Sequence, residues 1–495
     1  MTDLAAQEAG TGLRFYDSSL GKVVDFIPLK PGHVGIYLCG ATVQGSPHIG
    51  HMRAALAFDV LRRWLEYRGL DVTFVRNVTD IDDKILAKSA EAGWQWWAWA
   101  ARFEREFSQA YRALNVLDPT VEPRATGYIT DQIALVNRLI ERGHAYTDGT
   151  SGNAYFDVQS LPDYGSLTHQ LLDDLATTED ASQVDALAEL GKRDARDFAL
   201  WKACKPGEPE SAAWDTPWGR GRPGWHLECS AMAQRFLGDS FDIHAGGIDL
   251  RFPHHENEQA QSHGAGWGFA QLWMHNAWVT IKGEKMSKSL GNSLVVQEIL
   301  KRVPAQVLRL ALVSTHYRAT VEYSEDSLEA AGHLWEKFAG FVSRAEGAGV
   351  DILDCEALSQ VELPGGFVQA MNEDLNVAGG LAFLHAAVKD GNQALSTQDG
   401  PALQTAYEQI RGMLAVLGLD PRDVAWSQCG NAAVPDTPST APTQALDTLI
   451  HSLLDARAQA RADKDWARAD ELRDQLTKAG IILEDSPTGT TWQLG

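Results

Sequence analysis

Two short segments of the chain carry residue types suited to phosphate chemistry. The first is PHIGH at 47–51, which follows a predicted strand and opens a predicted helix. The free N–H groups and the dipole of a helix N-terminus attract anions. At that point His48 and His51 could donate hydrogen bonds to phosphoryl oxygens, and Gly50 would let the backbone approach closely. The alternative is a pair of histidines that merely caps a helix.

The second segment is KMSKS at 285–289, in a loop bounded by glycines. Lys285 and Lys288 would suit the charge that develops on phosphorus during a reaction, whereas a solvated surface loop is the ordinary alternative. Each segment is ambiguous when taken alone. In this order, however, the two resemble the signatures of class I aminoacyl-tRNA synthetases. That resemblance would make both lysines, and both histidines of the first segment, catalytic.

A further group of residues combines thiols with an imidazole and a carboxylate. Cys39 ends the first predicted strand, Cys229 lies in a GWHLEC segment, and FPHHENE opens a helix after its proline. In that helix His254 and Glu258 are four residues apart and share a face, although the spacing to Glu258 is also compatible with His255. Two thiolates, one imidazole and one carboxylate form a four-ligand set for zinc.

A zinc protease and a disulfide framework are the main alternatives for these residues. A zinc protease would need His-Glu-x-x-His, and HENEQ at 255–259 lacks the second histidine, which excludes that class. The five cysteines are few for the chain length, so we expect reduced thiols and no disulfide framework. Cys204, Cys355 and Cys429 are expected to be small, buried, apolar side chains.

Composition limits the function classes. A chain of 495 residues suggests two to four domains. The net charge of −23 argues against a general nucleic-acid binder, so any RNA contact must come from local basic patches and a specific shape. The first residues show no secretory signal, and nothing approaches the roughly eighteen apolar residues of a membrane span. We therefore expect a cytoplasmic protein that does not contact the membrane.

The order of predicted elements is typical of a nucleotide-binding α/β fold. A buried strand at Val34–Cys39 is followed by a helix over about 50–68, a strand at Asp71–Val78 and a helix at Thr79–Ala92. This strand–helix–strand order is typical of a doubly wound parallel sheet. Further parallel strands are predicted at 240–247 and 277–281.

The later chain changes in pattern several times. Helical periodicity dominates over about 324–417, and a Gly-, Pro-, Ser- and Thr-rich stretch follows. The predicted organisation is a Rossmann-like catalytic domain over 14–325, with an insertion at about 120–220 and the KMSKS loop region at 270–325, then a helical bundle over 326–426, a linker over 427–444 and a small C-terminal domain over 445–495.

Several longer segments are similar to the cysteinyl-tRNA synthetase family, and the likeness runs from about residue 14 to the end. The segments are Cys-Gly after the first strand, RNVTDIDDK at 76–84, GWHLEC at 224–229, DIHAGGID at 242–249, HHENE at 254–258, KDWARAD at 464–470 and GIILEDSPTGTTW at 480–492. The resemblance implies an enzyme that activates L-cysteine with ATP and transfers it to tRNA(Cys).

The resemblance also implies roles for single residues. Zinc, one ion per chain, would be held by Cys39, Cys229, His254 and Glu258. The cysteine pocket would be lined by Gly40, Thr79, Trp225 and His244. ATP, bound with Mg²⁺, would contact His48, Gly50, His51, Asp249, Lys285 and Lys288. A zinc–thiolate contact would remove the need for an editing domain, and we expect a monomer.

Two departures from the family pattern stand near these residues. The family commonly has Tyr-Asp where this chain has Gln44-Gly45, which puts local contacts to ATP or to the cysteine amino group in doubt. The run from His244 to Gly247, His-Ala-Gly-Gly, replaces a commoner run of glycines. Neither change removes a candidate ligand or a phosphate-binding residue.

Two rival functions are a ligase that shares the catalytic half and a binding module without catalysis. A mycothiol-type ligase would join cysteine to an amino-sugar inositol and would lack the C-terminal region. A zinc-stabilised nucleotide-binding module would be expected to lose a lysine or histidine of the signatures, and none is lost. In the C-terminal region, helical spacing predicts one basic stripe for RNA, formed by Arg457, Arg461, Lys464 and Arg468, with Trp466 near the opposite face, packing the helix down.

Overall fold

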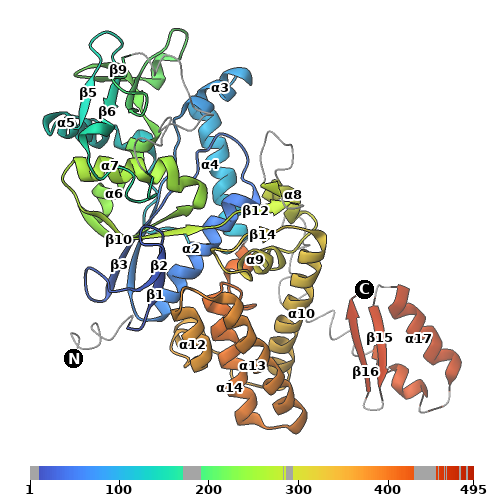
Figure 1. Cartoon of the computed structure of the whole chain (residues 1–495). Coiled ribbons are helices and arrows are strands. Elements are labelled where there is room, and N and C mark those ends of the chain that lie inside the picture. Colours follow the sequence, from blue (N-terminus) through green and yellow to red (C-terminus); the bar gives the residue numbers. More distant parts are fainter. Residues whose placement is uncertain are drawn as a thin grey trace. The chain divides into compact units, whose positions relative to one another are not determined.

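The computed structural model divides the chain into two compact units, Met1–Cys429 and Gly430–Gly495 (Figure 1). The residues it describes are 11–170, 191–281, 284–285, 294–428, 453–454, 456–461, 463, 465–478, 481–486 and 489–494. No helix in these ranges is both long and apolar enough to cross a membrane.

The first unit is built on a four-stranded parallel sheet. Its strands are β3 (His33–Leu38), β4 (Asp71–Arg76), β10 (Ser240–Gly247) and β11 (Phe269–Asn276), in the spatial order β11-β10-β3-β4. Five of the six residues of β3 are buried, as expected for a strand covered on both faces. The predicted α/β class with a Rossmann-like catalytic domain is confirmed.

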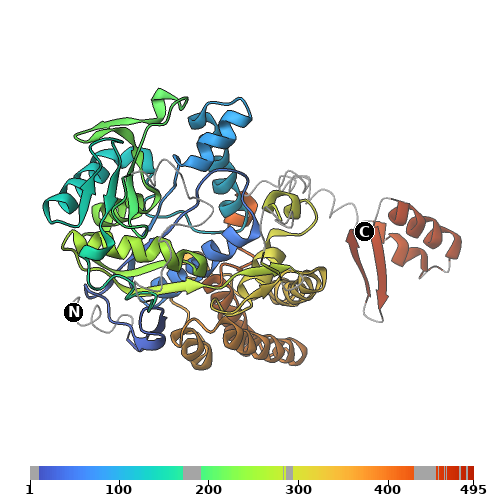
Figure 2. The same ribbon diagram turned by 45° about the horizontal axis from the view of Figure 1, so that its top comes forward.

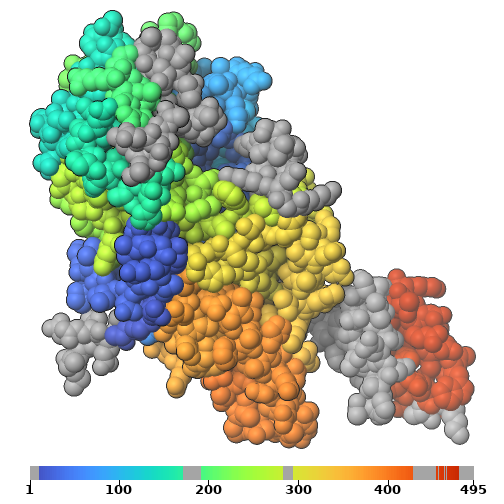
Figure 3. Space-filling model, viewed as in Figure 1, coloured from blue at the N-terminus to red at the C-terminus, as the bar shows by residue number. Residues whose placement is uncertain are grey.

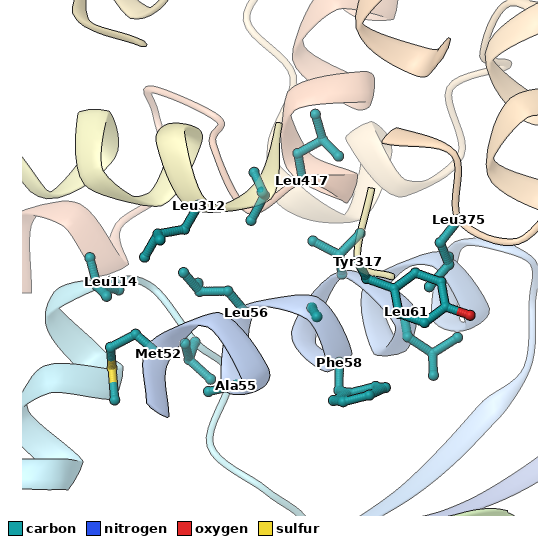
Figure 4. Close-up of a cluster of buried hydrophobic side chains, with 14 of the residues drawn as sticks. Met52, Ala55, Leu56, Phe58, Leu61, Leu114, Leu312, Tyr317, Leu375 and Leu417 are labelled. Atoms are coloured by element: carbon teal, nitrogen blue, oxygen red, sulfur yellow. The ribbon is translucent and has the colours of Figure 1, made fainter. Parts of the chain in front are cut away.

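Helix α2 (Ile49–Tyr67) follows β3 and lies at the centre of the largest hydrophobic core. Figure 4 shows Leu56 of α2 directed toward Leu312 of α9 (Ala305–Val313), while Phe58 points to the other side of the helix. Because apolar residues occupy more than one face of α2, the helix is buried on several sides. It therefore fixes the PHIGH segment at its N-terminus against the rest of the unit.

Two predicted elements differ from the structure. The fourth strand of the parallel sheet is β11, whereas the predicted strand at 277–281 contains β12 (Val279–Ile281) of a separate sheet. In that sheet β12 pairs with β13 (Glu284–Lys285) and with β14 (Val321–Glu322). The helix predicted from Thr79 begins at Asp83, because Asp82 caps it by accepting a hydrogen bond from the Lys84 N–H at 2.8 Å.

The insertion forms an antiparallel sheet with its own hydrophobic core. Its strands are β5 (Ala145–Thr147), β6 (Ala154–Phe156), β7 (Phe198–Ala203), β8 (Trp214–Thr216) and β9 (Gly219–Pro223), in the order β5-β6-β7-β9-β8, with α5 (Ile129–Glu141) alongside. Helices α3 (Asp83–Glu91) and α4 (Trp96–Ala113) form a hairpin on the same side of the parallel sheet as the insertion (Figures 1 and 2).

Hydrogen bonds join this hairpin to the insertion. Lys202 of β7 donates from Nζ to Asp83 at 2.9 Å, and Trp96 donates from Nε1 to Ser211 at 3.0 Å. The N-terminal ends of both helices are therefore fixed to the insertion.

The first unit extends from the insertion to a helical bundle. Figure 3 shows the insertion (teal to green) at one end and the helical bundle (orange) at the other. The remaining elements are β1 (Arg14–Asp17), β2 (Lys22–Asp25), α6 (Trp225–Leu237), α7 (Glu256–Gly264), α8 (Val296–Leu300), α10 (Glu325–Gly347), α11 (Cys355–Ser359), α12 (Gly365–Asn372), α13 (Val377–Thr397), α14 (Gly400–Val416) and α15 (Ala425–Gln428).

The second unit contains α17 (Trp466–Lys478) and an antiparallel hairpin of β15 (Ile481–Ser486) and β16 (Gly489–Leu494). The predicted single basic stripe does not form, because Arg457 is only 7% exposed and lies on a helical turn that ends before α17 begins. The prediction that Trp466 packs the helix down is also wrong, since it is 58% exposed. Helix α17 is instead anchored by Leu472 and Leu476. Lys464 lies outside the described residues.

Candidate active site

The predicted zinc ligands meet at the carboxyl edge of the parallel sheet. Cys39 follows β3, Cys229 lies on α6, and His254 and Glu258 lie in the turn and helix after β10. The Cys39 Sγ is 3.8 Å from the Cys229 Sγ and 3.4 Å from Glu258 Oε1, and His254 Nε2 is 3.0 Å from the same oxygen. All four donor atoms lie within 4.8 Å of one another.

Two of these distances, 3.8 and 3.4 Å, match a tetrahedral metal site, and the third, 3.0 Å, is somewhat shorter. Zinc binds sulfur at about 2.3 Å and nitrogen or oxygen at about 2.0–2.2 Å, which places neighbouring ligand atoms roughly 3.3–3.8 Å apart. Cys229, His254 and Glu258 are buried, and Cys39 is partly buried. Burying two thiols, an imidazole and a carboxylate together is costly without a compensating partner, and a metal cation would supply one.

The charge state of the cluster follows from its own contacts. Burial would raise the pKa of the Cys229 thiol, but its interactions with Cys39 and His254 lower it to about 6. Burial would lower the pKa of His254, but the Glu258 carboxylate and Cys229 raise it to about 10. Burial likewise opposes ionisation of Glu258, whereas His244 and His254 hold its pKa well below the usual value. The cluster thus favours the thiolate of Cys229 and the carboxylate of Glu258, whereas burial and the neighbouring Cys229 raise the pKa of the Cys39 thiol well above its usual value.

A second set of donors shares two of these residues. Among the described residues, Cys39, His244, His255 and Glu258 also bring donor atoms within 4.8 Å of one another. His255 Nδ1 is 2.8 Å from His275 Nε2, and burial lowers its pKa well below the usual value. This set has one sulfur where the first set has two.

The residues predicted to line the cysteine pocket surround this cluster. The Trp225 ring stacks on the His254 ring, with centroids 4.1 Å apart. His244 Nε2 is 2.8 Å from Glu258 Oε2. Thr79, which is buried, donates from its hydroxyl to Glu228 Oε2 at 2.7 Å. The structure therefore brings Trp225 and His244 into contact with predicted zinc ligands, and Thr79 into contact with the residue before Cys229.

Gly40 lies where the chain turns away from the sheet. Its N–H donates to Asn77 Oδ1 at 2.8 Å, and an added Cβ would lie 1.6 Å from the Asn77 carbonyl oxygen. A side chain cannot occupy this space, so the glycine is required for the close approach of the two backbone segments.

The first signature stands at the N-terminus of α2, as predicted. The rings of His48 and His51 stack with centroids 3.6 Å apart, and the His48 N–H donates to His51 Nδ1 at 3.2 Å. The Ile49 N–H, however, donates to the Leu294 carbonyl at 3.1 Å. That group of the first turn is therefore already hydrogen-bonded, and the expectation of freely exposed N–H groups is wrong for it.

The structure also links the first signature to the segment that follows the second. The Val296 N–H donates to the Pro47 carbonyl at 3.0 Å, and His48 pairs with Val295. Lys285 lies on β13, paired with Thr280 of β12. Lys288 lies outside the described residues. Asp249 follows β10 and is exposed at the same edge of the sheet.

The other cysteines differ in their exposure to solvent. Cys355 is exposed at the start of α11 and Cys204 is partly exposed after β7, so the prediction that both are buried is wrong. Each lies at the end of an element on the surface, which a residue type alone does not reveal. Cys429 lies outside the described residues.

Two residues at the site were missed by the sequence analysis although both lie in GWHLEC. Burial raises the pKa of Glu228, whose carboxyl accepts a hydrogen bond from the hydroxyl of Thr79, well above its usual value. His226 Nδ1 is 3.0 Å from His254 Nδ1. The segment itself was recognised, but helical spacing could not show which of its polar side chains turn inward.

The parallel sheet, with the first signature at the N-terminus of α2, has the fold of a class I aminoacyl-tRNA synthetase catalytic domain. Residues 25–333 match the model of the "tRNA synthetases class I (C) catalytic domain". Among solved structures, a Mycobacterium tuberculosis methionyl-tRNA synthetase in complex with methionyl-adenylate shares the fold, with a TM-score of 0.56, 16% identity, and coverage of 80% of this chain and 92% of that one.

Closer relatives identify the family within this class. A cysteine–tRNA ligase of Beutenbergia cavernae is 58% identical over 97% of this chain and 99% of its own length. The corresponding protein of Streptomyces coelicolor is 53% identical over 98% of this chain and 75% of its own. Residues 366–419 match the DALR domain, and residues 443–492 match the cysteinyl-tRNA ligase anticodon binding domain. The chain belongs to the cysteine–tRNA ligase family.

Proposed function

We propose that the protein activates L-cysteine with ATP to cysteinyl-adenylate and transfers the cysteinyl group to the 3′ end of tRNA(Cys). The observation that carries this proposal is the cluster of Cys39, Cys229, His254 and Glu258, whose donor atoms lie within 4.8 Å of one another at the carboxyl edge of the sheet. The first signature opens at the same edge, so a thiol-selective site would stand beside a phosphate-binding site.

The cluster is the proposed zinc site, with one ion per chain. The set with two sulfurs is favoured over the set that uses His244 and His255, because soft thiolate ligands suit zinc. Bound there, zinc would supply a soft Lewis acid that accepts the thiolate of cysteine but is poorly matched by the hydroxyl of serine. An apolar pocket alone would separate such close analogues by only about 1–3 kcal/mol.

The chain's own residues would then orient the substrate. Trp225 holds His254 by stacking, and His244 holds Glu258 by a hydrogen bond. Both contacts limit the freedom of proposed metal ligands. Thr79, together with the backbone turn at Gly40, is proposed to line the space for the cysteine amino and carboxylate groups.

Activation would proceed without a protein nucleophile. The carboxylate of cysteine attacks the α-phosphorus of ATP, a new O–P bond forms, and the bond to the departing diphosphate breaks. His48, His51, Lys285 and Lys288 are proposed to neutralise the charge on phosphorus, with Gly50 and Asp249 helping to position the Mg²⁺–ATP substrate. Catalysis would then consist of positioning and electrostatic stabilisation.

The C-terminal match separates this function from its rival. A ligase that joins cysteine to an amino-sugar inositol has no use for an anticodon-binding region, whereas residues 443–492 match one. The proposed partners are therefore tRNA(Cys), ATP and L-cysteine, with the cytoplasm as the site of action and a monomer as the working form. The proposed domain limits remain 14–325, 326–426 and 445–495, with a linker at 427–444.

One experiment tests the proposal directly. Cysteine-dependent exchange between ATP and labelled diphosphate should be observed, followed by transfer to tRNA(Cys) and not to an amino sugar. Serine at equal concentration should support little exchange. Equal exchange with cysteine and serine would contradict the thiol-selective site, and transfer to the amino sugar would support the rival ligase.

A further inference from the structure

The segment from Cys39 to His48 connects the proposed zinc site with the proposed phosphate site. At its beginning it is fixed to the sheet, because the Cys39 N–H donates to the Ala245 carbonyl at 3.1 Å and the Val43 N–H donates to the Thr79 carbonyl at 3.2 Å. Its geometry at that end is therefore set by β10 and by the chain after β4.

In the middle of this segment, Gln44 receives two hydrogen bonds from the α3–α4 hairpin. Lys88 of α3 donates from Nζ to the side-chain oxygen Oε1 of Gln44 at 2.7 Å. Trp99 of α4 donates from Nε1 to the main-chain carbonyl of Gln44 at 3.2 Å. One residue thus carries both a side-chain and a main-chain anchor, and the two donors come from different helices.

Ring contacts hold the side chain of Trp99. The Trp99 ring meets the Phe103 ring edge-on at 4.8 Å and the Trp94 ring at 6.1 Å. Lys88 and Trp99 are both partly buried. A charged donor in a partly buried hydrogen bond contributes more than one in water, so this contact can hold the segment against thermal displacement.

We propose that Gln44 is a positioning residue through which the α3–α4 hairpin sets the place of His48. The inference rests on the proposed function and deepens it. Only Gly45 and Ser46 separate Gln44 from the PHIGH segment, so Gln44 and the pairing with residues 294–296 together set the place of His48. The zinc end has its own hydrogen bonds to the sheet, and the PHIGH end is bonded to residues 294–296, so the anchor at Gln44 acts on the link between them.

This arrangement predicts unequal effects on the two substrates. Loss of the Gln44 anchor should raise the KM for ATP and lower kcat of diphosphate exchange, while the KM for cysteine and the zinc content stay within about twofold. Removing a hydrogen bond to a charged donor should change kcat/KM for ATP by about tenfold. A merely structural loss would instead lower stability and affect both substrates together.

The test uses the full chain with paired substitutions. Gln44→Leu and Lys88→Met each remove one side of the side-chain contact, and the double variant should be no worse than either single one. Gln44→Glu and Lys88→Arg keep an acceptor and a donor and should restore most of the ATP kinetics. Trp99→Phe keeps the ring packing but removes the donor to the main chain, and should shift the ATP kinetics in the same direction.

A matched control is Arg105→Gln, which removes a cation from an exposed position of the same hairpin and should leave the kinetics unchanged. If the wild-type chain exchanges diphosphate but Gln44→Leu and Lys88→Met do so normally, the inference is overturned while the proposed function stands. Additive effects in the double variant would also overturn it. If the wild-type chain shows no cysteine-dependent exchange, the proposed function itself fails.

Discussion

At the scale of single residues, the proposed metal site depends on the pairing of two sulfurs. Cys39 arrives from a strand and Cys229 from a helix, yet their Sγ atoms are 3.8 Å apart without a disulfide. Serine in either place would keep the size and polarity of the side chain but would replace a soft ligand by a hard one. This makes Cys→Ser the sharpest probe of the site.

Cys229→Ser should lower the zinc content of the purified protein and raise the KM for cysteine far more than the KM for ATP. Metal analysis and diphosphate-exchange kinetics measure both effects. Cys355→Ser is the matched control, because Cys355 is exposed and lies on α11 of the helical part. Full zinc occupancy together with normal cysteine kinetics in Cys229→Ser would refute the zinc assignment.

Lys288→Ala should reduce kcat of diphosphate exchange by about 10²–10³ with little change in cysteine binding, because its charge is needed in the transition state. Rapid-quench measurement of adenylate formation would report the loss. Lys301→Ala is the control, since Lys301 is exposed and pairs with Glu298 on the surface. An effect confined to the KM for cysteine would assign the loop a different role.

Residue types predicted most of the candidate ligands, but they did not predict which other polar side chains are buried beside them. Two thiols, a histidine and a glutamate stand out in a sequence because few other functions need them together. Glu228 does not, since a glutamate in a helix is ordinarily a solvated residue. Its burial against Thr79 depends on how α6 meets the sheet, which is decided by packing and not by local pattern.

At the scale of elements, a buried ion-pair network joins helices that lie far apart in the sequence. Asp59 of α2 is buried and accepts from Arg309 of α9 at 2.5 Å and from Arg63 at 2.9 Å. The same Arg309 donates to the carbonyls of Leu114 and Leu417, each at 2.8 Å. This network fixes the helix that carries the first signature against α9, the end of α4 and the end of α14.

Asp59→Asn should destabilise the chain by about 3–5 kcal/mol, because it leaves the buried guanidinium of Arg309 without its counter-charge. Urea denaturation at neutral pH would measure the change. The control is Arg62→Gln on the same helix, whose pair with Glu66 is partly exposed and should contribute at most about 1 kcal/mol. Equal effects of the two substitutions would contradict the network's importance.

The same carboxylate predicts a pH dependence. Burial would raise the pKa of Asp59, but Arg63 and Arg309 lower it to about 2, below its value of about 3.9 in an unfolded chain. Its contribution is therefore complete above about pH 4 and is lost as pH falls toward 2, with a total of roughly 2–3 kcal/mol. The stability difference between wild type and Asp59→Asn should shrink over that range, and a constant difference would disprove the assignment.

Local pattern predicted the elements unevenly, for identifiable reasons. The strand at β3 and the helix at α2 were predicted because their apolar residues are dense and bounded by turns. Strand β11 was missed because two apolar runs, 269–276 and 279–281, lie next to each other in the sequence. Only the pairing with β10 shows that the first run belongs to the parallel sheet. The basic stripe failed because a break near Asp463 separates Arg457 from α17, so one helical wheel cannot describe both.

At the scale of the whole molecule, chemistry and tRNA choice are predicted to reside in different units. The catalytic-domain match ends at residue 333, within the first unit, and the anticodon-domain match covers residues 443–492, within the second. The candidate zinc and phosphate residues all precede residue 289. Units with separate cores commonly fold independently, so the two functions should be separable by truncation.

A chain ending at Ala432 should therefore retain zinc and cysteine-dependent diphosphate exchange close to the full-length level. It should lose most aminoacylation of tRNA(Cys), because the region that matches the anticodon-binding domain has been removed while the adenylate is still made. Gel-filtration of the truncated chain checks that it stays folded, and parallel exchange and charging assays separate the two steps. The full-length chain is the control in each assay. If both chains aminoacylate tRNA(Cys) equally well, the second unit does not bind the anticodon. The residues that select the tRNA would then belong to the first unit.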